Sequence, residues 1–159
     1  MGHDDLLREQ LVELLRGGHA HATFDRIVEG FPAEKFAIRP PGMAHSGWEL
    51  LEHMRIAQND ILQFSESADY VSPGWPDEYW PSSQGPADAR EWDNSVRLFR
   101  EDLKTFETLV KNTQRDLFRP FPWGDGQTLL REALLIADHN SYHLGQLLLV
   151  RRALGNWSE

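Results

Sequence analysis

Prolines and glycines divide this chain of 159 residues into four long segments, and in each segment the apolar residues recur at helical spacing. The spacing predicts helices over Asp4–Glu29, Gly47–Ser65, Ala87–Thr113 and Thr128–Gly155. No stretch alternates apolar and polar residues as a half-buried strand would. Four amphipathic helices of this length most simply pack as an all-α four-helix bundle, here one domain over 1–159. The Pro-, Gly- and Ser-rich stretch 66–86 is long enough to be a crossover connection.

Several helix ends are marked by residues that cap helices. Ser46, with Glu49 three positions later, has the pattern of a capping box at the start of the second helix. Gly155 suits the position just after the last helix, where the backbone often enters the left-handed region. The pair Gly17-Gly18 lies inside the first helix and is expected to weaken and kink it.

The charge and the cysteine content restrict the possible partners. Sixteen basic and 25 acidic residues give a net charge of −9, which repels a phosphate backbone, so no nucleic acid partner is expected. No apolar run approaches the roughly 18 residues of a membrane span, and the acidic start is unlike a signal peptide, so no membrane is expected. The sequence has no cysteine, which excludes disulfides and thiolate metal ligands and fits a cytoplasmic protein.

The segment 137–150, "ADHNSYHLGQLLLV", places two histidines one turn apart in a helix that otherwise reads as buried. At about 100° per residue, His143 lies about 40° from His139. Three apolar residues share their stripe: Ile136, Leu147 and Val150. A second apolar stripe lies on nearly the opposite face, so this helix is either central in the fold or covered by a second subunit. In both cases the histidines are expected to face the bundle interior.

The second helix offers a third imidazole at His53, on an apolar stripe that also carries Asp60 about 20° away. This pattern predicts that His53, His139 and His143 converge on one metal ion. Neutral imidazole suits zinc, nickel, copper or iron, and three protein ligands leave a position open for chemistry. The alternative is that these are core histidines that hydrogen-bond within the bundle, because a pair of histidines four residues apart also arises by chance.

Two stretches carry a resemblance to a known family: "HSGWELLEHMRIAQNDIL" and "TLLREALLIADHNSYHLGQLLLVRRALG". Together they resemble the DinB-like superfamily over almost the whole chain, most specifically in the D-H-N-x-Y-H-x-G-Q pattern of the last helix. The resemblance implies a four-helix bundle with non-sequential topology that is commonly a homodimer. It also implies a divalent metal held by one histidine of the second helix and two of the last, which here are His53, His139 and His143.

Better-understood members of that family are metal-dependent transferases that use low-molecular-weight thiols. The resemblance therefore implies a metal ion, zinc or nickel, that activates a thiol cosubstrate for attack on a small-molecule electrophile. A chain without cysteine is compatible with this role, because the sulfur arrives with the cosubstrate. Two alternatives stay open: a metal-dependent hydrolase in which the ion activates water, and a non-catalytic stress protein that binds a metal or a small molecule.

Three polar residues are candidates for the surroundings of the metal. Asp60 and Glu132 either orient an imidazole through its second N–H group or lie as ordinary carboxylates on a helix surface. Gln146 either reaches the site or bonds a backbone group. For Asp60 and Glu132 the sequence favours the surface carboxylate, and for Gln146 it favours neither reading.

The loop "SPGWPDEYWP" is too long to be a mere connector. It is expected either to cap the metal pocket or to cover part of the core. Trp80 is the candidate pocket residue, whereas Trp75 is expected to cover the core. Of the remaining histidines, His19, His21 and His45 are not expected among the metal ligands.

Overall fold

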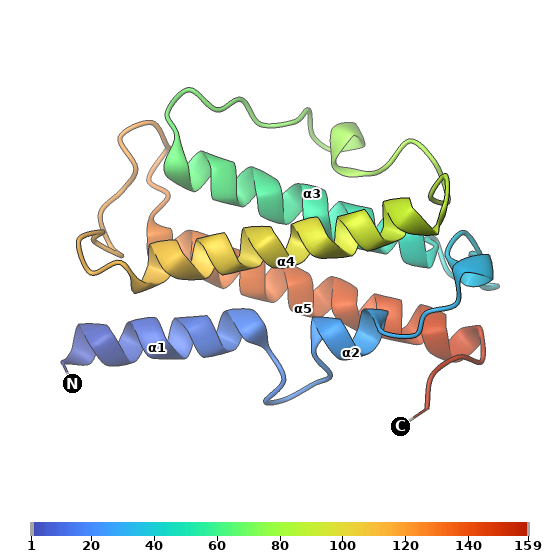
Figure 1. The fold of residues 1–159 in the computed structure, drawn as a ribbon. Coiled ribbons are helices and arrows are strands. Elements are labelled where there is room, and N and C mark those ends of the chain that lie inside the picture. The colour runs from blue at the N-terminus through green and yellow to red at the C-terminus, as the bar shows by residue number, and fades with distance from the viewer. Residues whose placement is uncertain (1, 159) are drawn as a thin grey trace.

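A computed structural model describes residues 2–158, and these residues form an all-helical bundle (Figure 1). The elements in chain order are α1 (His3–Arg16), α2 (Phe24–Val28), the 3-10 helix η1 (Ala33–Lys35), α3 (Gly47–Glu66), the 3-10 helix η2 (Asp77–Tyr79), α4 (Ala89–Lys111) and α5 (Leu129–Ala153). No β-strand occurs within 2–158, and no helix of that range is long and apolar enough to cross a membrane. The predicted all-α class is confirmed.

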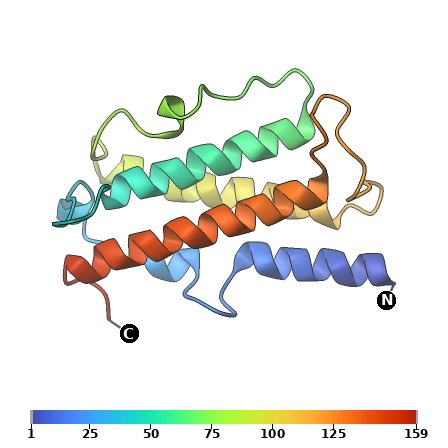
Figure 2. The same ribbon diagram turned by 180° about the vertical axis from the view of Figure 1, so that it is seen from behind.

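The long helices pack in an order that differs from their order in the chain. α3 packs on both α4 and α5, and α1 packs on the same two helices (Figure 1, Figure 2). α3 and α4 run in the same direction, so the connection 67–88 returns along the length of the bundle before α4 begins. α5 runs antiparallel to α3 beside it. This arrangement is the expected bundle with a long crossover connection.

The first predicted helix is in fact two helices, so the prediction of one kinked helix over 4–29 was wrong. α1 ends at Gly17, and both Gly17 (φ 67°) and Gly18 (φ 91°) adopt the left-handed conformations that glycine tolerates best. The chain restarts as α2 only after Thr23, whose side chain accepts a hydrogen bond from the backbone N–H of Arg26. Two adjacent left-handed residues end a helix instead of bending it, and α1 and α2 therefore lie end to end along one side of the bundle (Figure 2).

The caps predicted for the other helices are present. The backbone N–H of Glu49 donates to Ser46 Oγ at 3.2 Å, and the backbone N–H of Ser46 donates to Glu49 Oε2 at 2.8 Å, which completes the capping box of α3. At the end of α5, Gly155 has φ 68° and the N–H of Asn156 donates to the carbonyl of Arg151 at 3.1 Å. This is a Schellman ending, in which glycine supplies the left-handed residue.

The core has two apolar clusters, one towards each end of the bundle. The first includes α2 and the N-terminal halves of α3 and α4, and the second includes α1 and the N-terminal half of α5. A buried polar link crosses between α3, α4 and α5. Gln58 Nε2 donates to the carbonyl of Phe99 at 2.7 Å, and Asn140 Nδ2 donates to Gln58 Oε1 at 2.9 Å. This link ties the middle of α5 to α3 next to His139.

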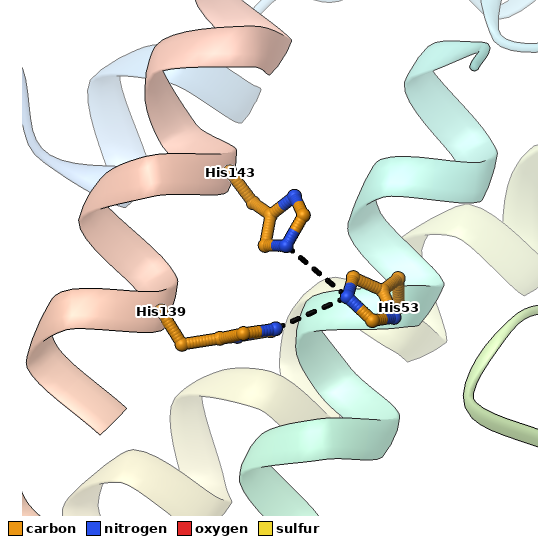
Figure 3. A group of neighbouring side chains, drawn as sticks. All are labelled: His53, His139 and His143. Atoms are coloured by element: carbon orange, nitrogen blue, oxygen red, sulfur yellow. Dashed lines mark hydrogen bonds between the residues drawn. The ribbon is translucent and has the colours of Figure 1, made fainter. Parts of the chain in front are cut away.

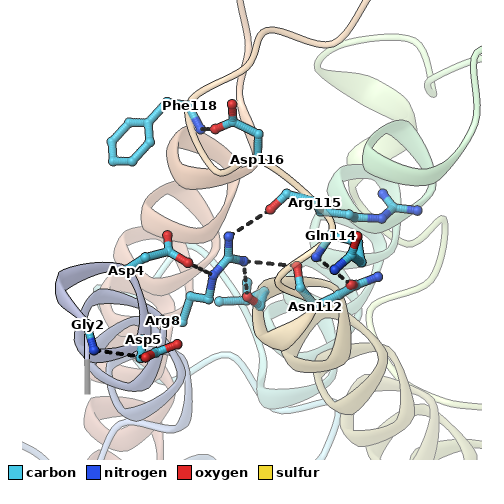
Figure 4. A network of polar contacts seen from close by, with 10 residues as sticks. Gly2, Asp4, Asp5, Arg8, Asn112, Gln114, Arg115, Asp116 and Phe118 are labelled. Carbon is cyan, nitrogen blue, oxygen red and sulfur yellow. Dashed lines mark hydrogen bonds and ion pairs between the residues drawn. The ribbon is translucent and has the colours of Figure 1, made fainter.

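Arg8 is a buried charge that ties α1 to the end of α4 (Figure 4). Its guanidinium donates to the backbone carbonyls of Val110 (2.7 Å), Asn112 (3.1 Å) and Arg115 (2.7 Å) and forms an ion pair with Asp4 at 2.7 Å. Carbonyls at a helix C-terminus have no partner within the helix and form the negative end of its dipole. The Arg8 guanidinium gives these carbonyls hydrogen-bond donors and places a positive charge at the negative end of the dipole. α1 and α4 are therefore joined by charge as well as by apolar packing.

Candidate metal centre

The three histidines singled out in the sequence come together between α3 and α5 (Figure 3). His53 is in α3, and His139 and His143 are one turn apart in α5. The Nε2 atom of His53 lies 3.1 Å from His143 Nε2 and 3.0 Å from His139 Nε2, and the three ligand atoms all lie within 4.8 Å of one another. His53 and His143 are buried and His139 is partly buried. The antiparallel pairing of α3 and α5 thus brings together residues 86 and 90 positions apart in the chain.

In two of the three imidazoles, a neighbouring oxygen acceptor determines which ring nitrogen carries the proton. His53 Nδ1 lies 2.8 Å from the backbone carbonyl oxygen of Tyr79, and His143 Nδ1 lies 2.7 Å from Gln146 Oε1. Because these oxygens only accept hydrogen bonds, each Nδ1 carries the proton. The Nε2 atoms of neutral rings then present lone pairs, and those of His53 and His143 face each other without a proton between them. Such an arrangement calls for a cation.

The surroundings keep these rings neutral. Burial lowers the pKa of His139 to about 4, and the neighbouring His143 and His53 act in the same direction. Burial also lowers the pKa of His143 to about 4, although its hydrogen bond to Gln146 acts in the opposite direction. The pKa of His53 is lowered for the same reason. Neutral imidazole is the form that binds a metal ion, so the site is prepared for one at neutral pH.

Two of the three nitrogen separations agree with a single ion. The third is bounded only at 4.8 Å, and two ligands of one ion span at most about 4.2 Å, so a bound ion would draw the rings of His139 and His143 together. For metal–nitrogen distances of about 2.0–2.1 Å, two ligand nitrogens lie about 2.9 Å apart at a right angle and about 3.3 Å apart at a tetrahedral angle. The two separations at His53, 3.1 and 3.0 Å, fall between these values. The three-histidine cluster is therefore compatible with metal binding, with the remaining coordination positions left to non-protein ligands.

Trp80 of the crossover covers one side of the cluster. Its ring stacks on His53 at 3.9 Å with an interplanar angle of 2°, and His45 stacks on Trp80 at 4.0 Å and 15°. Trp80 thus lies between two imidazoles and against the candidate ligand His53. The sequence did not indicate this contact of His45, because the residue precedes α3 and has no periodic spacing that would place it.

The two acidic candidates do not contact an imidazole among the described residues. Asp60 Oδ2 accepts a hydrogen bond from the hydroxyl of Tyr79 at 2.7 Å, and Glu132 pairs with Arg131 at 2.7 Å. Burial and the nearby Asp60 raise the pKa of Tyr79 and raise that of Tyr70 to about 12. Burial also raises the pKa of Glu132. Asp60 is linked to the cluster through Tyr79: the Tyr79 hydroxyl donates to Asp60, and the Tyr79 backbone carbonyl accepts a hydrogen bond from His53 Nδ1–H.

The structure also places Trp75 of the crossover and the two histidines His19 and His21, none of which belongs to the three-histidine cluster. Trp75 does not cover the core, because 76% of its surface is exposed, and it contacts Tyr79 edge-on at 5.3 Å. Trp75 lies in a turn of the crossover between Gly74 and Pro76, where its side chain stays at the surface. His19 and His21 lie exposed in the break between α1 and α2 and do not belong to the cluster, although His21 Nε2 lies 3.3 Å from Ser141 Oγ of α5.

Comparison with known proteins gives one match. The sequence model of a family described as the DinB superfamily matches residues 18–147. That range extends from the break before α2 into α5 and contains all three clustered histidines. No curated protein and no solved structure matches the chain.

Proposed function

The chain belongs to the DinB superfamily, and on that premise we propose that it is a metal-dependent transferase. In this proposal His53, His139 and His143 hold one divalent ion, and a low-molecular-weight thiol attacks a small-molecule electrophile at that ion. The observation that carries the proposal is the convergence of three Nε2 atoms, two of them with their lone pairs fixed towards the same point.

A bound zinc or nickel ion would lower the pKa of an incoming thiol, so that the thiolate forms at neutral pH. The protein supplies the rest. Tyr79 and Gln146 fix the rotation of two ligands through their Nδ1 protons. Trp80 shields one face of His53 from water, which strengthens the electrostatic interactions at the site. The chain has no thiol of its own, so the sulfur comes from the cosubstrate. The reaction then forms a sulfur–carbon bond while the bond from that carbon to the leaving group breaks. The leaving group departs with the electron pair, as chloride does from chlorodinitrobenzene, and the thiol proton leaves to solvent.

The proposal includes a cytoplasmic location and a homodimer. Low-molecular-weight thiols are kept reduced in the cytoplasm, where such a cosubstrate is available.

The dimer is supported by Leu134 and Tyr142, two large apolar side chains that α5 exposes. Light scattering after size exclusion is expected to give twice the monomer mass, and Tyr142→Lys to give the monomer mass. A monomer in both samples would contradict the dimer without bearing on the metal.

The metal is tested by mass spectrometry on untagged protein. The parent is expected to hold about one equivalent of zinc or nickel, and His53→Ala and His139→Ala are expected to hold almost none. The matched control is His19→Ala, which removes an exposed histidine in the break between α1 and α2. Circular dichroism checks that each variant is folded. Full metal content in His139→Ala would refute the ligand assignment.

The reaction is tested with the metal-loaded protein. Thiols such as bacillithiol, mycothiol and glutathione are offered together with chlorodinitrobenzene as a general electrophile, and thioether formation is followed. The expected result is turnover that needs both the thiol and the metal and that is lost in His53→Ala. Hydrolysis of a nitrophenyl ester without any thiol would instead indicate a hydrolase. Stoichiometric metal with no turnover of either kind would indicate a binding protein.

A further inference from the structure

A cavity of about 220 Å³ lies directly beside the metal centre and is not part of it. Its walls are mainly apolar, and the apolar residues include Met43, Leu50, Leu149 and Val150. Only two lining residues carry polar side chains, namely His45 and Gln146. The volume is below the roughly 300–1,000 Å³ of sites for drug-sized ligands, so the cavity suits a small molecule.

Both polar lining residues also belong to the surroundings of the metal cluster. Gln146 Oε1 accepts the hydrogen bond from His143 Nδ1 at 2.7 Å, and His45 stacks on Trp80, which in turn stacks on His53. The polar end of the cavity is therefore the end next to the histidines, and the apolar walls extend away from them. A ligand in this cavity has its polar group near the metal and its apolar part at a distance.

The same two residues have unused hydrogen-bonding capacity. With Oε1 of Gln146 facing His143, the amide NH₂ group has no partner among residues 2–158, and neither ring nitrogen of His45 has a hydrogen-bond partner in that range. An amide NH₂ and an imidazole N–H both donate to an oxygen acceptor. No lysine or arginine lines the cavity, so in the metal-free protein a carboxylate would lose its hydration there without gaining a cation. A neutral carbonyl oxygen satisfies the donors without that cost.

We propose that this cavity holds the electrophilic substrate, and that the substrate is a small neutral carbonyl compound, an ester with an unbranched or lightly branched apolar chain. In the reaction the thiol sulfur bonds to the carbonyl carbon, the carbon–oxygen single bond breaks, and the alkoxide takes up a proton and leaves as the alcohol; an amide such as hexanamide is the unreactive analogue. The carbonyl oxygen accepts hydrogen bonds from Gln146 and His45, and the chain packs against Leu149 and Val150. This assignment rests on the proposed function for its role in a reaction, but the binding itself needs only the cavity.

Binding is tested with hexanamide as the probe, by following methyl and backbone NMR signals of the protein during titration. The signals expected to shift are those of Met43, Leu50 and Val150. Propanamide keeps the amide but lacks three methylene groups, and it is expected to bind at least about tenfold more weakly. Hexanoate has the same chain with a carboxylate, and it is also expected to bind more weakly than hexanamide to the metal-free protein.

Two variants locate the probe. Leu149→Lys places a charge in the apolar wall and is expected to weaken hexanamide binding at least fivefold. Its matched control is Leu14→Lys on α1, because the two leucines are similarly exposed (51% and 49%) and Leu14 does not line the cavity. His45→Phe retains an aromatic ring against Trp80 but removes the nitrogens, and it is expected to weaken hexanamide binding about threefold.

The outcomes separate this inference from the proposed function, because metal content is measured on the same samples. Shifts elsewhere on the protein, equal affinities for hexanamide and propanamide, or equal effects of Leu149→Lys and Leu14→Lys would overturn the cavity assignment. If hexanamide binds as expected to protein that takes up no metal, the cavity assignment stands and the metal-dependent reaction falls. Stoichiometric metal without hexanamide binding would overturn the cavity assignment and leave the metal-dependent reaction standing.

Discussion

The side chain of His53 and the backbone of Tyr79 meet across the bundle surface, with His53 Nδ1 2.8 Å from the Tyr79 carbonyl oxygen. One residue belongs to α3 and the other to η2 in the crossover that follows it. The hydroxyl of the same tyrosine donates to Asp60, two turns along α3. Tyr79 is therefore fixed to α3 at two points, and its carbonyl decides which nitrogen of His53 faces the other histidines.

We expect Tyr79→Phe to lower both the free energy of unfolding and the affinity for metal. The change leaves Asp60 Oδ2 without its donor beside Oδ1, which is buried and has no partner in the structure. An unsatisfied buried polar group costs about 1–3 kcal/mol, and urea unfolding of the variant beside the parent measures this loss in the free energy of unfolding. A looser Tyr79 carbonyl is expected to weaken zinc binding about tenfold in a competition with a chelating dye. Unchanged zinc affinity in a destabilised variant would show that the two attachments are independent.

The stability of the metal-free protein should depend on pH through its histidines. In the unfolded chain these groups titrate near pH 6.5, whereas in the folded chain the pKa values of His139 and His143 are about 4. Between these values the unfolded state binds protons that the folded state does not, so stability falls as the pH is lowered from about 6.5 to about 4. Urea midpoints at several pH values measure this slope.

The control for the pH dependence is the double variant His139→Gln, His143→Gln. Carboxylates with lowered pKa values, such as Glu49 and Glu107, also cost stability in acid and contribute equally to both proteins. The parent is expected to have the steeper slope, by about 1–2 kcal/mol per pH unit between pH 6 and 5. Parallel slopes would mean that the two imidazoles titrate normally in the folded chain.

Replacing Arg8 is expected to be costly. Arg8→Met retains much of the apolar stem but leaves the carbonyls of Val110, Asn112 and Arg115 without their donor. We expect a loss of about 3 kcal/mol in the free energy of unfolding. Arg97→Met is the matched control, because Arg97 forms only an exposed pair with Glu101 and a contact with Asn94. Its removal should change stability by less than about 0.5 kcal/mol.

Two glycine-to-alanine changes are expected to have opposite signs. Gly18 has φ 91°, and a Cβ atom there would lie 2.9 Å from Thr23 Cγ2, so Gly18→Ala should destabilise the protein by about 1 kcal/mol or more. Gly145 is inside α5, and a Cβ atom at this position would have open space within 4 Å, so Gly145→Ala should stabilise by about 0.5–1 kcal/mol. Thermal melts of the two variants beside the parent test this contrast. A stabilising Gly18→Ala would contradict the left-handed break between α1 and α2.

Much of the fold was predictable because helix signals are local. The capping box at Ser46 and the glycine at 155 placed helix ends that the structure confirms. The convergence of His53, His139 and His143 followed from stripes that each helix must turn inward. The strength of the break at Gly17-Gly18 was not predictable in this way, because a glycine pair permits either a kink or a full stop, and packing of α2 on α5 decides between them.

The surroundings of the site were harder to predict, since they depend on groups without a sequence pattern. The acceptor for His53 is a backbone carbonyl, which every residue carries, and the carboxylates that the sequence offered for that role lie elsewhere. His45 meets Trp80 through two loops whose course no periodicity describes. The sequence did offer Trp80 as a pocket residue, but the carbonyl that accepts from His53 and the stacking of His45 on Trp80 were not foreseeable.

The 86 positions that separate His53 from His139 also set an order of events during synthesis. A ribosome adds roughly 5–20 residues per second, so the two ligands are made about 4–17 s apart. Throughout that interval the nascent chain offers His53 alone, and a single imidazole holds a metal ion only weakly. In the proposed function the ion is therefore chosen after α5 has docked, by a finished set of three nitrogens. Metal identity in the cell would then reflect the ions available to the folded protein and not those met by the emerging chain.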